Sequence, residues 1–251
     1  MKSKLKILVF SFRRNLQLTA FFDSLRLHCK DEVEVSVYEK DCSKLNGSQF
    51  RKDMFSELRG YEYVMFCVDD TIFTHDFSLE YVVKQLEHLP DAIGFSLRLG
   101  LNTDYCYMKD KPQFIPSIRS NKGECFAYKW TAAEWDFAYP LEVSSSVYRV
   151  EDIYPILENE KFDNPTRLEV VLHRNRHRPR KDLLMCFDQS VAFSAPFNRV
   201  QKMFPGNRSQ KYTAEFFEEL YQGGSRIDVE SYSGFVTNAA HQEVDLNLRG
   251  E

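Results

Sequence analysis

Apolar and polar residues follow a strand, helix, strand order through the first hundred positions. Short apolar or alternating runs, typical of β-strands, are separated by segments with apolar residues at helical spacing. The predicted strands are Leu5–Ser11, Val33–Tyr38, Tyr63–Val68 and Ala92–Leu97. The predicted helices between them are Asn15–Leu27, Phe50–Arg59 and Ser78–Glu87. This order is typical of parallel, right-handed α/β units, so we expect an α/β fold with a mostly parallel central sheet sandwiched by helices.

The periodicity weakens after Gly100. The polar and aromatic segment Asn102–Tyr128 predicts loops and short pieces rather than long elements. Further helices are predicted over Val150–Asn159, Asn164–Arg174 and Thr213–Leu220, the second of them with an Asn cap and a Pro in its first turn. No linker composition divides the chain. We therefore expect one domain over residues 1–251, with a regular half over 1–100 and an irregular half over 101–251.

Composition narrows the class of protein. The chain has 251 residues, 43% of them hydrophobic and 14% aromatic, which is enough for a sizeable core and excludes disorder along its whole length. With 33 basic and 37 acidic side chains the net charge is −4, so no nucleic-acid partner is expected. No apolar run approaches the ~20 residues of a transmembrane segment. Six cysteines without a CxxC pair indicate reduced thiols and a cytoplasmic location.

Polar side chains follow three predicted strands. They are Ser11 and Arg13, then Glu39 and Asp41, then Asp69 and Asp70. Because ligands bind at the carboxyl ends of strands in open parallel sheets, these side chains predict a pocket at one edge. Two adjacent carboxylates need water or a cation, and their oxygens suit Mg²⁺ or Mn²⁺. The alternative for the Asp pair, an exposed turn that caps the next helix, stays open.

Three segments resemble family 2-type glycosyltransferases with the GT-A fold. They are SFRRNLQLTAFFDSL, VSVYEKD and YVMFCVDDTIF, and their order matches over about residues 5–100. The resemblance implies a nucleotide-sugar-binding half over 1–100 and an acceptor and catalytic half over 101–251. It also implies an enzyme that moves a sugar, with inversion, from a nucleotide-diphosphate sugar to an acceptor hydroxyl. A UDP-sugar is the favoured donor, and a glycan or another hydroxyl compound is the acceptor.

The resemblance also assigns roles on the donor side. The nucleotide-sugar contacts it implies are Ser11, Arg13, Glu39, Asp41, Asp69 and Arg98, and the metal ligands for Mn²⁺ or Mg²⁺ are Asp69, Asp70 and His241. The family has Asp-x-Asp where this chain has Asp-Asp-Thr. Either Asp70 is the ligand in a shifted register, or Thr71 replaces the second aspartate and weakens metal binding.

The second half is expected to supply the base and the acceptor contacts. Glu169 is our first candidate for the base that deprotonates the acceptor, and Asp163 is the second. Each has a structural alternative: Asp163 as a helix cap and Glu169 as a partner of a basic neighbour. The candidate acceptor contacts are Trp130, Trp135 and Asp136, with the two tryptophans equally explained as core anchors. Glu142 or Ser144 is expected to contact the donor sugar.

Three other interpretations stay open. The same fold can hold a sugar nucleotide or a glycan without transferring it, as a binding module. VDDTIF faintly resembles the nucleophile loop of haloacid-dehalogenase-like phosphatases, but it follows the third strand and not the first. The basic segment Arg174–Lys181 is either a solvated turn or a contact for anions and membrane headgroups, which would bring the protein to a membrane surface.

Overall fold

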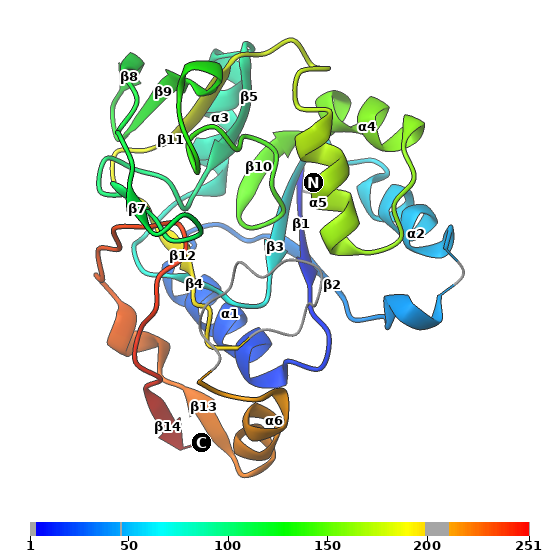
Figure 1. Cartoon of the computed structure of the whole chain (residues 1–251), viewed down its shortest axis with the longest axis vertical. Helices are drawn as coiled ribbons and strands as arrows, with labels where there is room; N and C mark the ends of the chain where they lie inside the picture. Colours follow the sequence, from blue (N-terminus) through cyan, green and yellow to red (C-terminus); the bar gives the residue numbers. More distant parts are fainter. Residues whose placement is uncertain (1–3, 46, 199–210, 251) are drawn as a thin grey trace.

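The computed structural model describes residues 4–45, 47–198 and 211–250, and its centre is a large twisted sheet (Figure 1). Within the described residues this sheet has eight strands in the order β2-β1-β3-β10-β5-β11-β9-β8. Their bounds are β1 Leu5–Phe10, β2 Glu34–Tyr38, β3 Tyr63–Val68, β5 Ala92–Ser96, β8 Ile118–Lys122, β9 Cys125–Lys129, β10 Ser146–Arg149 and β11 Leu183–Phe187. The predicted strands of the first half are confirmed within a residue or two.

The sheet is mixed, which corrects the expectation of a mostly parallel one. β1 pairs in parallel with β2 and β3, and β5 pairs in parallel with β11. β10 is antiparallel to both β3 and β5, and β9 is antiparallel to β11 and β8. A parallel neighbour needs a crossover connection, whereas β10 enters directly from a loop at the carboxyl edge, where Ser145 N donates to Phe66 O at 2.7 Å.

Helices cover both faces of the sheet, as expected for an α/β sandwich (Figure 1). The helices are α1 Asn15–His28, α2 Gln49–Leu58, α3 Leu79–His88, α4 Val150–Asn159, α5 Pro165–Arg174 and α6 Ala214–Gln222. Alternate residues of β1 enter different cores: Leu8 and Phe10 pack with α2, α4 and α5, while Ile7 and Val9 pack with α1 and α3. This period of two is what a strand buried on both faces produces.

Local sequence explains where several helices begin. The Asn164 side chain accepts a hydrogen bond from Arg167 N at 2.9 Å, and Pro165 occupies the first turn of α5. Ser78 caps α3 and Thr213 caps α6 in the same way. The predicted start of α5 is confirmed by this cap.

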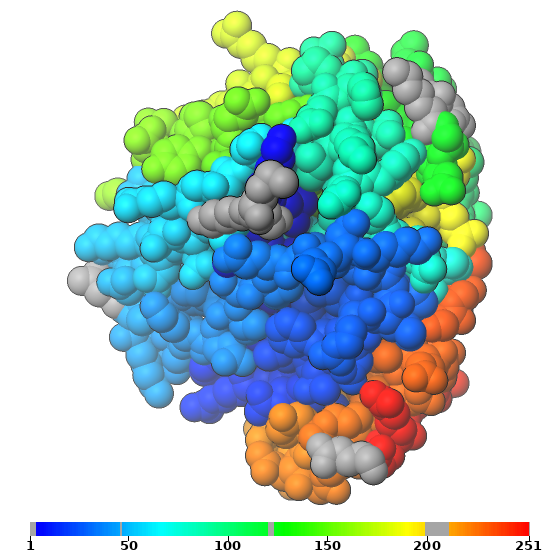
Figure 2. All heavy atoms as spheres, turned by 180° about the vertical axis from the view of Figure 1, so that it is seen from behind, coloured from blue at the N-terminus to red at the C-terminus, as the bar shows by residue number. Residues whose placement is uncertain are grey.

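The second half contains more strand than the sequence suggested. β8 and most of β9 lie within the segment expected to be loops and short pieces, and β11, for which we predicted no element, lies beside β5 near the middle of the sheet. Smaller elements are β4 Thr71–Phe73, β6 Tyr105–Cys106, β7 Lys111–Pro112, β12 Ala192–Ser194, β13 Ser225–Ile227, β14 Leu248–Gly250 and the 3-10 helices η1 Cys42–Lys44, η2 Trp130–Ala132 and η3 Val229–Tyr232. β12 pairs with β4, and α6 packs against α1 through a third core. Figure 2 shows the α6–β13 segment in orange below the blue N-terminal residues.

All six cysteines are free thiols, and four of them are buried. Among the described residues, none of the helices combines the length and the apolar character needed to cross a bilayer.

Candidate functional site

Polar residues from distant parts of the chain meet at the carboxyl edge of the sheet. The ends of β1, β3 and β5 lie there, and so does the beginning of β10, because this strand runs in the opposite direction. The pairing of Ser146 with Phe66 and Ser96 brings the loop before β10 against the ends of β3 and β5. The β4–β12 ladder adds residues that follow the Asp pair.

Asp69 is held by an arginine that the sequence interpretation did not select. Its carboxylate is only 3% exposed, and Arg14 Nη1 donates to Asp69 Oδ1 at 2.5 Å. Arg14 Nη2 donates to Asn198 Oδ1 at 2.9 Å, so both terminal nitrogens of its guanidinium group are hydrogen-bonded. Burial raises the pKa of Asp69 to about 6, against the opposing charge of Arg14 and a hydrogen bond from Ser11. Asp69 therefore forms an internal ion pair and lies beside Ser11, a predicted nucleotide-sugar contact.

Asp70 keeps one oxygen available. Its Oδ2 lies 3.7 Å from Arg14 Nη1, while its Oδ1 is shielded from solvent and has no hydrogen-bond partner among the described residues. Burial raises the pKa of this carboxyl, and Arg14 and Arg98 oppose the shift. In the part of the chain that the structure describes, three or more His, Cys, Asp or Glu side chains do not gather into a ready metal centre. Metal binding by Asp69, Asp70 and His241 stays a prediction.

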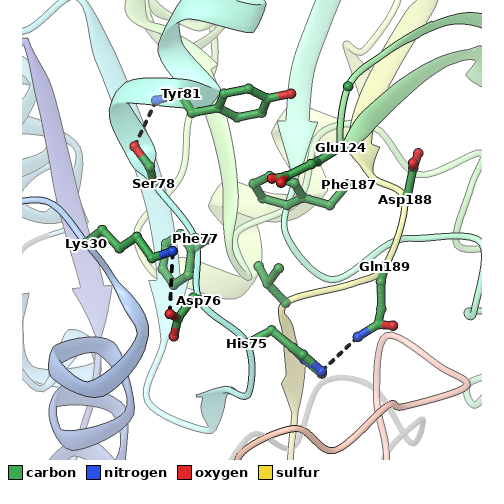
Figure 3. Close-up of a pocket in the computed structure, with 12 residues that line it drawn as sticks. Lys30, His75, Asp76, Phe77, Ser78, Tyr81, Glu124, Phe187, Asp188 and Gln189 are labelled. Atoms are coloured by element: carbon green, nitrogen blue, oxygen red, sulfur yellow. Dashed lines mark hydrogen bonds and ion pairs between the residues drawn. The ribbon is translucent and has the colours of Figure 1, made fainter.

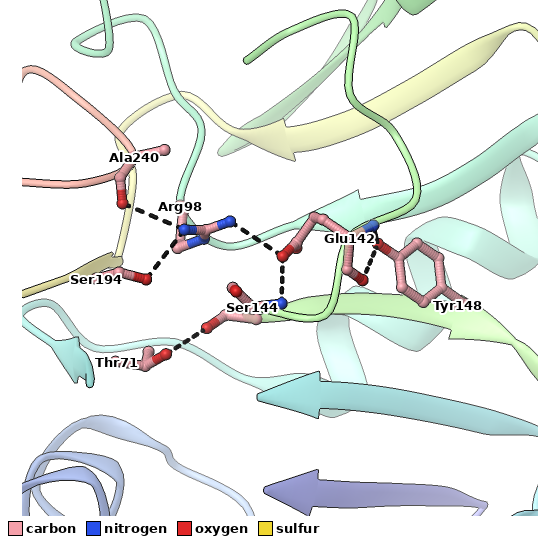
Figure 4. Close-up of polar contacts among 8 residues, drawn as sticks. Thr71, Arg98, Glu142, Ser144, Tyr148, Ser194 and Ala240 are labelled. Atoms are coloured by element: carbon pink, nitrogen blue, oxygen red, sulfur yellow. Dashed lines mark hydrogen bonds and ion pairs between the residues drawn. The ribbon is translucent and has the colours of Figure 1, made fainter. Parts of the chain in front are cut away.

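Arg98 is the centre of a buried network (Figure 4). Its Nη2 donates to Glu142 Oε2 at 3.0 Å, and its Nη1 donates to Ser194 Oγ at 3.0 Å and to Ala240 O at 3.4 Å. Glu142 also accepts from Ser144 N. Arg98 Nε and Glu142 Oε1 have no partner among the described residues. Unpaired polar atoms this deep need an explanation, and a ligand at the sheet edge is one.

Glu169 and His241 border this network and have strongly shifted pKa values. Burial and the nearby charge of Glu142 raise the pKa of Glu169 to about 7, and Arg98 limits the shift. Burial and Arg98 lower the pKa of His241 to about 3, so this imidazole is neutral. His241 Nδ1 also lacks a partner among the described residues, and its ring stacks on Tyr107 with centroids 6.2 Å apart.

Several residues predicted to bind the nucleotide sugar or to act as the base lie outside the Arg98 network. Arg13 is exposed, and the central carbon of its guanidinium group lies 5.1 Å from the centroid of the Phe12 ring. Glu39 is exposed, and Asp41 caps η1 by accepting from Ser43 N at 3.1 Å. Asp163 pairs with Arg167 one helical turn away, at 3.0 Å. Their assigned roles stay predictions. The cap alternative for Asp163 is wrong, because Asn164 caps α5.

The predicted acceptor residues separate into a core residue and a loop pair. Trp130 is 2% exposed and donates from Nε1 to Lys181 O at 3.0 Å, which favours the core-anchor alternative. Trp135 is partly exposed and has a φ of 46°, a conformation that costs energy for a bulky residue. Asp136 accepts from Gln113 Nε2 at 3.4 Å, and burial raises its pKa.

The basic segment Arg174–Lys181 joins α5 to β11 and is partly neutralised. Lys181 lies 2.5 Å from Asp152, and Arg178 lies 3.6 Å from Glu160. These ion pairs favour a structural turn, and contact with anions or membranes stays a prediction.

Sequence reasoning missed Arg14 and Asn198 as site residues. Arg14 differs from the chosen Arg13 by one position, and Asn198 comes from a segment that carries no recognisable motif. Arg13 has a left-handed backbone, with a φ of 55°, in the turn after β1. This conformation sends the side chains of the two adjacent arginines into different environments.

One comparison with known proteins finds a distant glycosyltransferase relative. No family model matches the chain. A curated protein named "Bifunctional glycosyltransferase pgtA", from Dictyostelium discoideum, is 26% identical over 198 aligned residues, which cover 68% of this chain. The match covers 25% of that protein, so the chain spans about a quarter of its relative's length. A solved structure, "Crystal Structure of A197 from STIV", aligns over 76% of this chain and 85% of its own, at 12% identity and a TM-score of 0.36. The chain is thus distantly related to a glycosyltransferase.

Proposed function

We propose that the chain is a glycosyltransferase that moves a sugar, with inversion, from a nucleotide-diphosphate sugar to an acceptor hydroxyl. The observation that carries the proposal is Glu169, a carboxyl with a pKa of about 7 beside the Arg98–Glu142 ion pair at the carboxyl edge of the sheet. A base is most effective when its pKa lies near the working pH. The distant likeness to a glycosyltransferase supports the same reaction class.

The donor side needs positive charge for a diphosphate. In the part of the chain that the structure describes, Arg98 Nε is a donor without a partner and Asp70 Oδ1 is an acceptor without one. Mg²⁺ and Mn²⁺ usually take one or two carboxylates and complete their shell with waters and substrate phosphates, so Asp70 fits as the main protein ligand. A bound cation would neutralise charge on the departing diphosphate. A UDP-sugar is the donor we favour, on the sequence resemblance.

The acceptor side needs a place for a proton. In the proposed step the acceptor oxygen forms a bond to the anomeric carbon while the bond to the diphosphate oxygen breaks. The acceptor proton passes to Glu169, and the nucleoside diphosphate leaves. Arg98 keeps Glu169 ionisable near neutral pH, because without this positive charge burial and Glu142 would raise its pKa further.

The test combines turnover with binding. The chain is incubated with a panel of nucleotide sugars and candidate acceptors, with Mn²⁺, Mg²⁺ or EDTA, and release of nucleoside diphosphate is measured. Glu169→Gln should lower kcat by about 10²–10⁴-fold, the usual contribution of a general base. Thermal stabilisation by the nucleotide should persist in this variant, at about 2.7 kcal/mol when the ligand is at 100 times its Kd. Asp163→Asn is the matched control, and a loss of turnover only in that variant would reassign the base.

A binding module is the second candidate. The observation in its favour is that Asp69 forms an ion pair with Arg14 and that the described residues contain no preformed metal centre. Saturable binding of a sugar nucleotide or a glycan, without turnover across the panel, would favour it. Absence of both binding and turnover would refute both candidates.

A further inference from the structure

A cavity at the start of α3 is lined by residues other than those of the candidate site (Figure 3). Its volume is about 430 Å³, and it lies between the start of α3, the turn before β9 and the end of β11. Phe77 and Phe187 belong to the core shared with α1 and α3, whereas α5, which carries Glu169, packs on the opposite core. No role predicted from the sequence involves this cavity.

Aromatic rings form one wall of the cavity. The rings of Tyr81 and Phe187 lie nearly parallel, with an interplanar angle of 14° and centroids 6.1 Å apart. Phe77 and Val191 add apolar surface. Such a wall suits the apolar part of a ligand and, through the ring faces, a cation.

The hydrogen-bond donors of the cavity are already engaged. Lys30 Nζ lies 3.5 Å from Asp76, and Gln189 Nε2 donates to His75 Nε2 at 2.7 Å. The hydroxyl of Tyr81 donates to a cysteine sulfur at 3.4 Å. A ligand that takes hydrogen bonds from Gln189 or Tyr81 would compete with these contacts, whereas the exposed ammonium of Lys30 keeps donors to spare.

Two carboxylates of the cavity are not engaged in the same way. Asp188 Oδ1 is shielded from solvent and lacks a hydrogen-bond partner in the described ranges. Glu124 is exposed, and its backbone contacts that of Asp188, since Asp188 N donates to Glu124 O at 2.8 Å. Within the described part of the chain, neither carboxylate has a basic side chain in ion-pair contact. The cavity therefore offers acceptors and negative charge next to flat apolar faces.

We propose that this cavity binds an alkylguanidinium or alkylammonium ion. The charged end would donate to Glu124 and Asp188, and the apolar body would pack on Tyr81 and Phe187. A free amine and a basic side chain of a polypeptide share this chemistry. The inference does not depend on the proposed transfer reaction, so either can fail alone.

Calorimetric titration of the full chain tests the inference with matched probes. Butylguanidinium should bind saturably, and butylurea, its neutral analogue, should bind at least about tenfold more weakly, as expected for losing one charge-assisted hydrogen bond. Glu124→Gln and Asp188→Asn should each weaken butylguanidinium by about tenfold. Glu219→Gln, the same change on exposed α6, should leave the affinity unchanged. Because Glu124 is exposed, its variant keeps the test valid even if Asp188→Asn fails to fold.

A peptide whose only charged side chain is one central arginine distinguishes a polypeptide partner from a free amine. Tighter binding of the peptide than of butylguanidinium assigns the site to a polypeptide partner, and the reverse assigns it to a free amine. Equal binding of butylurea and butylguanidinium would overturn the proposal. So would an unchanged affinity in Glu124→Gln, or no saturable binding of any charged probe.

Discussion

Removing Arg98 should destabilise the protein far more than removing a surface arginine. Arg98 and Glu142 are 8% and 7% exposed and share a hydrogen-bonded contact of 3.0 Å. Arg98→Met leaves the Glu142 carboxylate buried with Ser144 N as its remaining partner. Breaking a buried ion pair in this way costs about 3–5 kcal/mol. For a chain of this size the melting temperature should fall by about 6–20 °C, at roughly 2–4 °C per kcal/mol.

Urea unfolding followed by circular dichroism at pH 7 measures this cost. Arg26→Met, which removes a 76% exposed partner of Asp23, is the control and should cost at most about 1 kcal/mol. Adding Glu142→Gln to Arg98→Met should restore part of the loss, because the uncompensated charge disappears. A loss below about 1 kcal/mol for Arg98→Met would refute the view that this ion pair is a buried, coupled unit.

Three further predictions concern single positions. The folded state binds a proton at Glu169 with a pKa of about 7 instead of 4.5, so its stability contribution is full below pH 4.5 and is lost as the pH rises to 7. Urea unfolding across this range should show that Glu169→Gln flattens the dependence, and an unchanged slope would contradict the burial of this carboxyl. Gly94→Ala places a Cβ 2.7 Å from Tyr148 Cδ1 and should cost about 1–3 kcal/mol in thermal unfolding; a neutral effect would mean that the ring moves freely. Thr213→Ala removes the 3.1 Å bond from Phe216 N and should cost about 0.5–2 kcal/mol, with faster amide exchange in α6 as the local sign; protection equal to the parent would argue against the cap.

Local periodicity was sufficient for most helices and for the first four strands of the central sheet. It failed for β9 and β11, five-residue strands that pair with each other across a long stretch of sequence, although β9 also pairs with the neighbouring strand β8. Leu183–Phe187 is an uninterrupted apolar run beside a basic segment, and a run this short does not distinguish a strand from a buried turn of helix. The reversed direction of β10 is a property of the assembled sheet, and no pattern within Ser146–Arg149 encodes it.

The candidate site was predictable in its location and less so in its residues. The rule that ligands bind at strand ends led to Asp69, Asp70 and Arg98, which the structure places at one edge. The choice between Arg13 and Arg14 depended on a left-handed backbone at Arg13, which a sequence with two adjacent arginines does not reveal. The burial of Asp69 and Arg98 at this edge appears only in three dimensions.

The late arrival of β10 has a consequence for how the protein is made. β3 and β5 lie on either side of β10, so they have no common neighbour until residues 146–149 have been synthesised. In the first hundred residues β3 would be open on one side and β5 on both, because β11 also comes later, and both strands carry apolar side chains on each face. Pairing across this sequence distance is slow and exposes the chain to aggregation while it waits. The order in which the ribosome releases the strands therefore differs from the order in which the sheet can close.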